Sequence, residues 1–304
     1  MAITRLSDLL TALQHDNHPM RLVAAYANDA HTIEACYEAV KNNLVKVCLV
    51  GDEPSIREVC QSHQIPIESF EVVHEPNDQA AAMKAVDLIN EGKADILMKG
   101  LVSTEKYMRA ILHKERGLMA PKSILSHVAV IDNPNYHKLL IVGDVAVIPA
   151  PELPEKIAIA NYLIDTAHAL GIEKPRLAII GAAETVSLRI PSSMDAAILS
   201  KMADRGQLKK AYVDGPLALD LAIDAESARI KKIDSPVAGN ADCLLFPNLE
   251  TGNVFYKTNT KLMDVSVAAI VAGAKAPCIL SSRGDSAQTK LYSIALAAMI
   301  AKNH

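Results

Sequence analysis

The stretch RLVAAYANDAHTIEACYEAVKNNLVKVCLVG, residues 21–51, decides the fold class of this chain. An apolar run over residues 21–27 precedes helical spacing of apolar residues over 31–43, and a second apolar run covers 44–51. Continuous apolar strands joined by a helix of this length are typical of parallel strands that helices cover on both faces. The stretch therefore predicts an α/β fold.

The alternation of apolar runs with helical patterns continues to the end of the chain. Further strands are expected at residues 70–74, 94–100, 126–131, 176–182, 212–215, 242–247 and 277–280. This rhythm is typical of doubly wound sheets with helices on both faces. We therefore predict two doubly wound α/β domains.

The length of 304 residues also suggests two domains, at ~150 residues each. The segment VIPAPELPEKIA, residues 147–158, has three closely spaced prolines, which hold a chain extended and favour the start of a helix. We predict that the chain crosses between domains there. The predicted first domain is 1–149, the second is 150–271, and the terminal strand and helix, 272–304, return to the first domain.

Composition excludes several classes of function. The net charge of −4 gives no reason to expect nucleic acid or an anionic membrane as a partner. No uncharged apolar run approaches the ~18 residues of a membrane span, and the N-terminal segment does not resemble a signal peptide. The five widely spaced cysteines indicate reduced thiols in a cytoplasmic protein, and with the histidines they form no zinc-binding spacing.

Ligands of doubly wound sheets bind beyond the carboxyl ends of strands, so the loops there are of most interest. In KGLVSTEKYMR, Gly100 allows a sharp turn, and Ser103 or Thr104 can cap the next helix. The start of a helix suits a phosphate, and Arg109 could add a bidentate contact. The structural alternative is that Ser103 is only a cap and Arg109 only a surface charge.

The SSRGDS segment also lies between an apolar strand pattern and a helical pattern, and it contains more side chains that could bind an anion or take part in a reaction. Ser282 and Arg283 supply a hydroxyl and a fork of donors, and Gly284 permits backbone conformations closed to other residues. Asp285 fits two interpretations: the cap of a capping box with Gln288, or a general base beside an anion bound by the arginine.

Five separated segments, taken in order, resemble phosphate acetyltransferases and phosphate butyryltransferases. They are KGLVSTEKYMRAIL, GDVAVIP, VDGPLALDLAI, DSPVAGNADCLLFPNLETGNVFYK and GAKAPCILSSRGDSAQTKLYSIALA. The resemblance runs from about residue 20 to the end of the chain. The sequences MKGLVST, DGPLALD and SRGDSAQTKLYSIALA resemble those of the butyryl branch more than those of the acetyl branch.

The resemblance implies a two-domain α/β enzyme of the isocitrate/isopropylmalate dehydrogenase-like kind, a homodimer with its site in an interdomain cleft. Its members catalyse acyl-CoA + phosphate ⇌ acyl phosphate + CoA, with no metal or cofactor and with coenzyme A as a substrate. The implied partners are acyl-CoA and inorganic phosphate, with butyryl or short branched-chain acyl groups preferred. How the adenine and 3′-phosphate of CoA are held stays open.

The resemblance also carries over residue roles. The SR motif maps to Ser282 and Arg283, and the arginine after the first glycine-containing loop maps to Arg109. The aspartate that the acetyl branch uses as a base is Thr289 here, which cannot take a proton, so either Asp285 assumes that role or no single side chain does. The predicted catalytic residues are Ser282, Arg283 and Asp285. The predicted phosphate- and CoA-binding residues are Gly100, Ser103, Thr104, Arg109, Gly284, Ser286, Asn253 and Tyr256, with loop anchoring as the structural alternative for the last two.

Direct transfer in a ternary complex is the expected mechanism. A covalent acyl-enzyme on Cys278 is the alternative, but an apolar strand surrounds that thiol. The alternative activities are a phosphate acetyltransferase, a metal-dependent 2-hydroxy-acid dehydrogenase of the same fold, and a non-catalytic acyl-CoA-binding regulatory protein.

Overall fold

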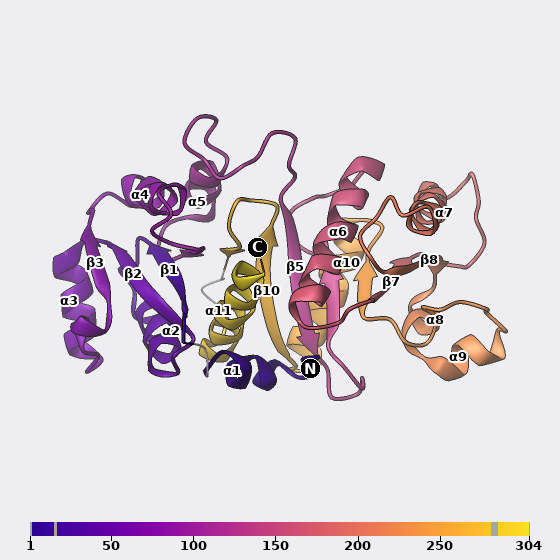
Figure 1. Ribbon diagram of the computed structural model, residues 1–304, viewed down its shortest axis with the longest axis horizontal. Coiled ribbons are helices and arrows are strands. Elements are labelled where there is room, and N and C mark those ends of the chain that lie inside the picture. The colour runs from indigo at the N-terminus through magenta and orange to yellow at the C-terminus, as the bar shows by residue number, and fades with distance from the viewer. Residues whose placement is uncertain (1, 15–16, 281–284, 304) are drawn as a thin grey trace. The chain divides into compact units, whose positions relative to one another are not determined.

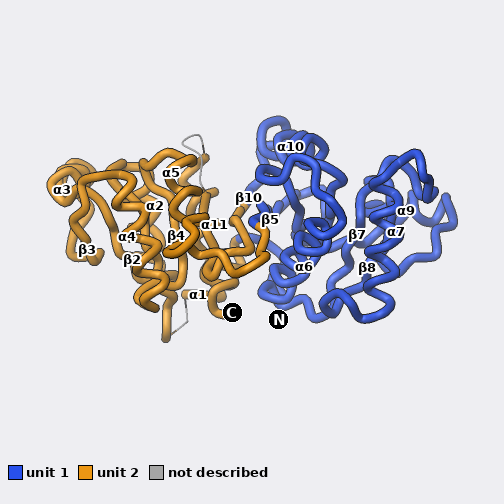
Figure 2. The backbone as a smooth tube through the Cα atoms, turned by 90° about the horizontal axis from the view of Figure 1, so that it is seen from above, with its two compact units in different colours: residues 1–6, 125–267 blue, residues 7–124, 268–304 orange. Residues whose placement is uncertain are grey.

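The computed structural model describes residues 2–14, 17–280 and 285–303. Two compact units divide the chain: unit 1 comprises residues 1–6 and 125–267, and unit 2 comprises residues 7–124 and 268–304 (Figure 2). Both units alternate strands with helices, so the predicted α/β class is confirmed.

Unit 2 is built on strands in the order β3–β2–β1–β4–β11–β10. The strands are β1 (Met20–Ala25), β2 (Val45–Gly51), β3 (Glu71–His74), β4 (Ile96–Lys99), β10 (Ser266–Ala272) and β11 (Cys278–Ile279). β3, β2, β1, β4 and β11 run parallel, and β10 is antiparallel to β11. β4 is buried along its whole length, as its continuous apolar sequence predicts.

Helices cover both faces of the unit 2 sheet (Figure 1). They are α1 (Leu6–Gln14), α2 (Ala30–Lys41), α3 (Glu53–Ser62), the short 3₁₀-helix η1 (Ile67–Ser69), α4 (Asp78–Asn90), α5 (Thr104–Ile111) and α11 (Ala287–Lys302). α2 packs against α3 and α11, whereas α4 packs against α5. The helices α2 to α5 begin at side-chain caps that accept a bond from the N–H three residues on: Asp29, Asp52, Asn77 and Ser103.

Unit 1 has the strand order β5–β6–β9–β7–β8. The strands are β5 (Ser126–Asp132), β6 (Leu140–Gly143), β7 (Arg176–Ile180), β8 (Tyr212–Leu217) and β9 (Cys243–Leu245). The helices are α6 (Leu153–Ala169), α7 (Pro191–Asp204), α8 (Leu219–Ile223), α9 (Ala225–Ile230), α10 (Leu249–Lys257) and the π-helix η2 (Thr258–Leu262). β5 and β6 pair antiparallel and the other strands parallel, so this sheet is mixed as well.

The structure differs from the predicted organisation in two respects. The chain passes between units at 6/7, 124/125 and 267/268 rather than at 149/150 and 271/272. The proline-rich segment lies within unit 1 and leads from β6 into α6, with Pro154 in the first turn of that helix. Strands β6 and β10 were not predicted, although LIVG and SVAAIVA are apolar runs; their antiparallel pairing is set by tertiary contacts.

Candidate active site

The carboxyl ends of the unit 2 strands converge on one edge of the sheet. Chain order reverses there between β1 and β4, because β2 and β3 lie on one side of β1 and β4 lies on the other. Such a switch point is where doubly wound sheets bind ligands. β11 lies next to β4, with Ile279 opposite Met98, so the KGLVST and SSRGDS segments leave neighbouring strands at the same edge.

The KGLVST turn packs closely on the end of β1. The N–H of Gly100 donates to the Ala25 carbonyl at 2.9 Å, and a Cβ on Gly100 would lie 2.5 Å from the carbonyl oxygen of Tyr26. Only glycine fits that approach. The buried Lys99 precedes it and donates from Nζ to the Gly100 carbonyl at 3.2 Å.

Ser103 caps α5, as predicted, and its Oγ accepts a hydrogen bond from the Lys106 N–H at 3.3 Å. Thr104 is the first residue of the helix. The guanidinium of Arg109 is largely exposed and pairs with Glu105 at 2.6 Å, one turn earlier. Arg109 therefore holds a surface ion pair in this structure, and its predicted phosphate contact requires that pair to open.

Tyr107, which the sequence did not single out, links the two loops. It is fully buried, and its hydroxyl lies within hydrogen-bond distance of the carbonyls of Leu97 in β4 (3.1 Å) and Ile279 in β11 (3.3 Å). One α5 side chain thereby contacts both strands that carry the motif loops.

The predicted residues Ser282, Arg283 and Gly284 lie outside the described residues. Asp285 and Ser286 follow them, and the structure corrects the capping interpretation. Ser286, not Asp285, is the N-cap of α11, because its Oγ accepts from the Thr289 N–H at 3.1 Å. The capping box of Asp285 with Gln288 is therefore wrong.

Thr289 takes part in the same cap. Its hydroxyl lies 3.0 Å from the Ser286 hydroxyl, so the side chain that replaces the acetyl-branch aspartate supports the start of the helix. Ser286 is exposed beside it.

Asn253 and Tyr256 belong to unit 1, apart in the chain from the unit 2 residues above. They lie on α10, a helix where the sequence predicted a loop; the helix begins at the cap Asn248, whose side chain accepts from the Thr251 N–H at 3.0 Å. The Asn253 amide donates to the Val145 carbonyl at 3.0 Å, which fits its predicted anchoring role. The ring of Tyr256 packs edge-on against His127, with centroids 6.3 Å apart.

The loop that Asn253 anchors is organised around a buried carboxylate. Asp144 accepts hydrogen bonds from the Ser126 hydroxyl and from the N–H groups of His127, Ala146 and Val147, at 2.7–3.0 Å. A Cβ on Gly252 would lie 2.2 Å from the Asp144 carbonyl oxygen, so α10 can pack on this loop only with glycine there.

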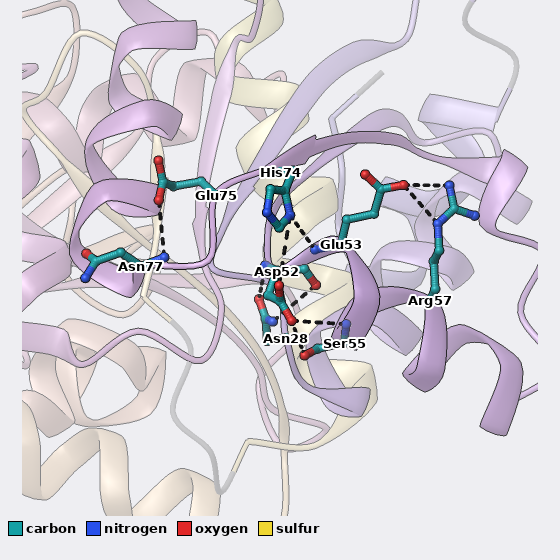
Figure 3. A network of polar contacts seen from close by, with 8 residues as sticks. All are labelled: Asn28, Asp52, Glu53, Ser55, Arg57, His74, Glu75 and Asn77. Carbon is teal, nitrogen blue, oxygen red and sulfur yellow. Dashed lines mark hydrogen bonds and ion pairs between the residues drawn. The ribbon is translucent and has the colours of Figure 1, made fainter.

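A polar network joins the loops after β1, β2 and β3 at the same edge of unit 2 (Figure 3). The Asn28 side chain accepts from the Asp52 N–H at 3.2 Å, and Nδ1 of His74 accepts from the Glu53 N–H at 3.1 Å. Asp52 caps α3 through the Ser55 N–H at 3.2 Å. These bonds satisfy the first turn of the helix and hold the edge beside the switch point in one arrangement.

The cysteine nearest the motif is a poor nucleophile. Cys278 is fully buried in β11, and this burial raises the pKa of its thiol to about 12, although Tyr107 acts to lower it. A thiol with that pKa is almost wholly protonated near neutral pH. Within the described ranges there is neither a cluster of three potential metal ligands nor a helix long and apolar enough to cross a membrane.

Comparison with known proteins agrees with this geometry. Residues 70–298 match the family model described as Phosphate acetyl/butaryl transferase. A phosphate butyryltransferase of Clostridium acetobutylicum is 47% identical over 93% of this chain and 94% of its own length. A phosphate acetyltransferase of Rhizobium meliloti is 41% identical over 97% of this chain and 93% of its own.

Solved structures give the same result. The crystal structure of a branched-chain phosphotransacylase from Enterococcus faecalis V583 superposes with a TM-score of 0.81 at 29% identity, covering 94% of this chain and all of the other. Sequence identity above 40% over nearly the whole chain, with the family's motif loops leaving adjacent strands, settles the relationship. The chain belongs to the phosphate acetyl/butyryl transferase family and is an acyltransferase.

Proposed function

We propose that the protein transfers a short acyl group between coenzyme A and inorganic phosphate, acyl-CoA + phosphate ⇌ acyl phosphate + CoA, with a preference for butyryl or short branched-chain groups. One structural observation carries the proposal: the KGLVST and SSRGDS segments leave the neighbouring strands β4 and β11 at the switch-point edge of unit 2. The identity to a butyryltransferase favours the four-carbon chain over the acetyl group.

The chemistry requires a bound phosphate with one oxygen free to attack the thioester carbonyl. The starts of α5 and α11, whose unpaired N–H groups and dipoles attract anions, support such a site. Arg283 and Arg109 are proposed to hold the phosphate and to stabilise the negative charge that develops on the thioester oxygen.

Ser282 is proposed to hydrogen-bond the sulfur or the thioester oxygen. Asp285 is proposed to remove the thiol proton of CoA in the reverse direction. Because Ser286 caps α11, helix capping no longer explains the presence of an acidic side chain at 285. That finding favours the base interpretation.

We further propose direct transfer in a ternary complex. The buried, protonated Cys278 thiol supports this route, because a covalent acyl-enzyme needs an accessible thiolate. Initial rates with both substrates varied should give intersecting double-reciprocal lines. Parallel lines would show a covalent intermediate and contradict the proposal.

A homodimer, cytoplasmic location and the isocitrate dehydrogenase-like domain arrangement stay proposals, supported by the family resemblance. Unit 1 adds a candidate interface: an apolar groove of about 790 Å³ between the strands and the helices α8, α10 and η2. Val254 lines the groove and is 65% exposed, and Leu262 on η2 is 82% exposed. Apolar side chains so exposed are typical of surfaces that a partner covers.

The oligomer proposal is tested by Val254→Glu, which places a charge in the groove. We expect the variant to sediment as a monomer while the wild-type protein sediments as a dimer. Ile198→Glu, at a 40% exposed site on α7 outside the groove, is the matched control and should stay dimeric. A Val254→Glu protein that remains dimeric would place the interface elsewhere.

The non-catalytic alternative, an acyl-CoA-binding regulatory protein, makes a different prediction. Such a protein would bind acyl-CoA without consuming it when phosphate is added. Loss of thioester measured with and without inorganic phosphate separates the two.

A further inference from the structure

Tyr26 has a main-chain conformation that is unusual for its residue type. It follows the last residue of β1 and has φ of 56°, in the left-handed region. Bulky residues are rarely found there, because the Cβ atom comes too close to the main chain, whereas glycine and asparagine adopt this conformation readily. Such strain persists only where the surrounding structure imposes it.

The place of Tyr26 in the fold sets it apart from comparable positions. Asn43, Gln64 and Lys232 also have positive φ, but each lies two residues after the end of a helix. A left-handed residue is a common way to end a helix. Tyr26 follows a strand instead, and it is the one aromatic residue with positive φ in the part of the chain that the structure describes. Its conformation therefore needs an explanation other than helix capping.

The carbonyl of Tyr26 connects two loops at the carboxyl edge of unit 2. It accepts hydrogen bonds from the N–H of Asn28, before α2, at 3.0 Å and from the N–H of Leu101, in the KGLVST turn, at 2.8 Å. The N–H of Gly100 donates to the carbonyl of Ala25 at 2.9 Å. Two consecutive N–H groups of the turn thus bond to two consecutive carbonyls at the end of β1.

The contact between this turn and β1 leaves little room for movement. A Cβ on Gly100 would lie 2.5 Å from the carbonyl oxygen of Tyr26 and 2.8 Å from that of Ala25. A rotation of φ at Tyr26 to negative values would move its carbonyl, because that group lies beyond the N–Cα bond. The N–H of Leu101 would then lose its acceptor.

The same contact determines where α5 begins. Leu101 is followed by Val102, which is 1% exposed, and then by Ser103, the N-cap of α5. Because Leu101 is bonded to the end of β1 and Val102 is packed in the core, the first turn of α5 is held beside β1.

We propose that Tyr26 is a positioning residue, whose left-handed main chain fixes the KGLVST turn and, through it, the start of α5. Phosphate is proposed to bind at that start, so the inference rests on the proposed function for the identity of the ligand. The main chain carries this role, and the phenol ring is not required for it.

Three substitutions separate the main chain of Tyr26 from its side chain. Tyr26→Gly, Tyr26→Asn and Tyr26→Val all remove the ring, but only glycine and asparagine adopt positive φ readily. We expect the glycine and asparagine variants to retain most of kcat/KM for phosphate. The valine variant should lose about a hundredfold, the scale of loss caused by a ~1 Å misplacement in an active site.

Gln64→Gly and Gln64→Val are the matched controls. Gln64 has the same φ of 56° and is exposed. It follows the end of α3, at the edge of the sheet from which β3 starts and opposite the candidate site. Valine should melt at a lower temperature than glycine at both positions, because the strain is alike. Only at residue 26 should valine also lower kcat/KM, an effect that a loss of stability alone would not produce.

Native-state hydrogen exchange tests the contact without any turnover. The amide of Leu101 should be protected in the wild type and in the glycine and asparagine variants of Tyr26. In Tyr26→Val it should exchange roughly tenfold faster, the factor that corresponds to the loss of one hydrogen bond.

Two results would overturn the inference. One is a Tyr26→Val protein with wild-type kcat/KM for phosphate and a protected Leu101 amide. The other is an equal loss of activity in all three variants with that protection retained, which would assign Tyr26 a side-chain contact with substrate instead. If the wild type transfers no acyl group, the exchange pattern still decides whether Tyr26 fixes the turn, and only the proposed function fails.

Discussion

The phenolic hydroxyl of Tyr107 lies 3.3 Å from the carbonyl oxygen of Ile279 and 3.1 Å from that of Leu97. A side chain of α5 thus contacts the last residue of β11 and an inner residue of β4. These are the strands that lead into the SSRGDS and KGLVST segments. The hydroxyl therefore adds a second link, beside the β-ladder, between the two strands that lead into these segments.

Tyr107→Phe tests this link. Loss of the buried hydroxyl bonds should lower the free energy of unfolding by about 1–2 kcal/mol and reduce kcat several-fold, as measured by urea denaturation and steady-state assay. Tyr136→Phe, which removes a 2.7 Å bond to the Ala241 carbonyl in unit 1, is the control and should cost similar stability without the loss of kcat. Equal kcat in both variants would show that the Tyr107 bond only stabilises the fold.

Asp285→Asn separates proton transfer from folding. Because Ser286 is the cap of α11, we expect the variant to keep that cap and to fold. Loss of a general base should reduce kcat in the direction that consumes CoA by ~10²–10⁴-fold. Wild-type turnover in a folded Asp285→Asn protein would exclude Asp285 as the base.

Ser286→Ala tests the cap itself. The substitution removes the acceptor of the Thr289 N–H and should lower the free energy of unfolding by ~1 kcal/mol, as measured by denaturation. Ser286→Asn should retain most of the stability, because asparagine caps as well as serine does. If the asparagine variant loses as much as the alanine variant, the cap does not lie at this residue.

Acid stability depends on Asp95 at the opposite edge of unit 2. Its carboxylate accepts from Nε and Nη2 of Arg21 at 2.9 and 2.6 Å, and this bonding lowers its pKa in the folded protein. The contribution is fully present above the unfolded pKa of ~4 and is lost as the pH falls through the lower folded value.

Asp95→Asn should therefore lower the free energy of unfolding at pH 7 by about 1 kcal/mol. The gap to the wild type should narrow as denaturation curves are recorded below pH ~4. Asp204→Asn, which breaks an exposed i,i+3 pair with Lys201, is the control and should change stability little at any pH. A gap that stays constant with pH would mean that the ion pair does not produce the effect.

Much of the fold could be predicted because buried parallel strands have continuous apolar sequences. The runs at 21–27 and 94–100 correspond to β1 and β4. The segment that forms α10 was expected to be a loop, because it follows the predicted strand at residues 242–247. Gly252 in this segment serves the close approach to Asp144, a tertiary requirement that no local pattern contains.

The candidate site could be located from its motifs, but not all of its residues could be identified from them. Ser103 was predicted as a cap because a serine before a helical pattern has a local signature. Tyr107 carries no such signature, since a tyrosine inside a helical pattern indicates only a core position. Its role arises from burial against strands distant in sequence.

The central claim is best tested by the loss of thioester from acetyl-, propionyl-, butyryl- and isobutyryl-CoA with and without inorganic phosphate. The thioester is followed directly, because the five cysteines of the protein would react with thiol reagents. We predict phosphate-dependent loss that is fastest with butyryl-CoA or isobutyryl-CoA. Binding of every acyl-CoA with no phosphate-dependent loss of any thioester would contradict the account.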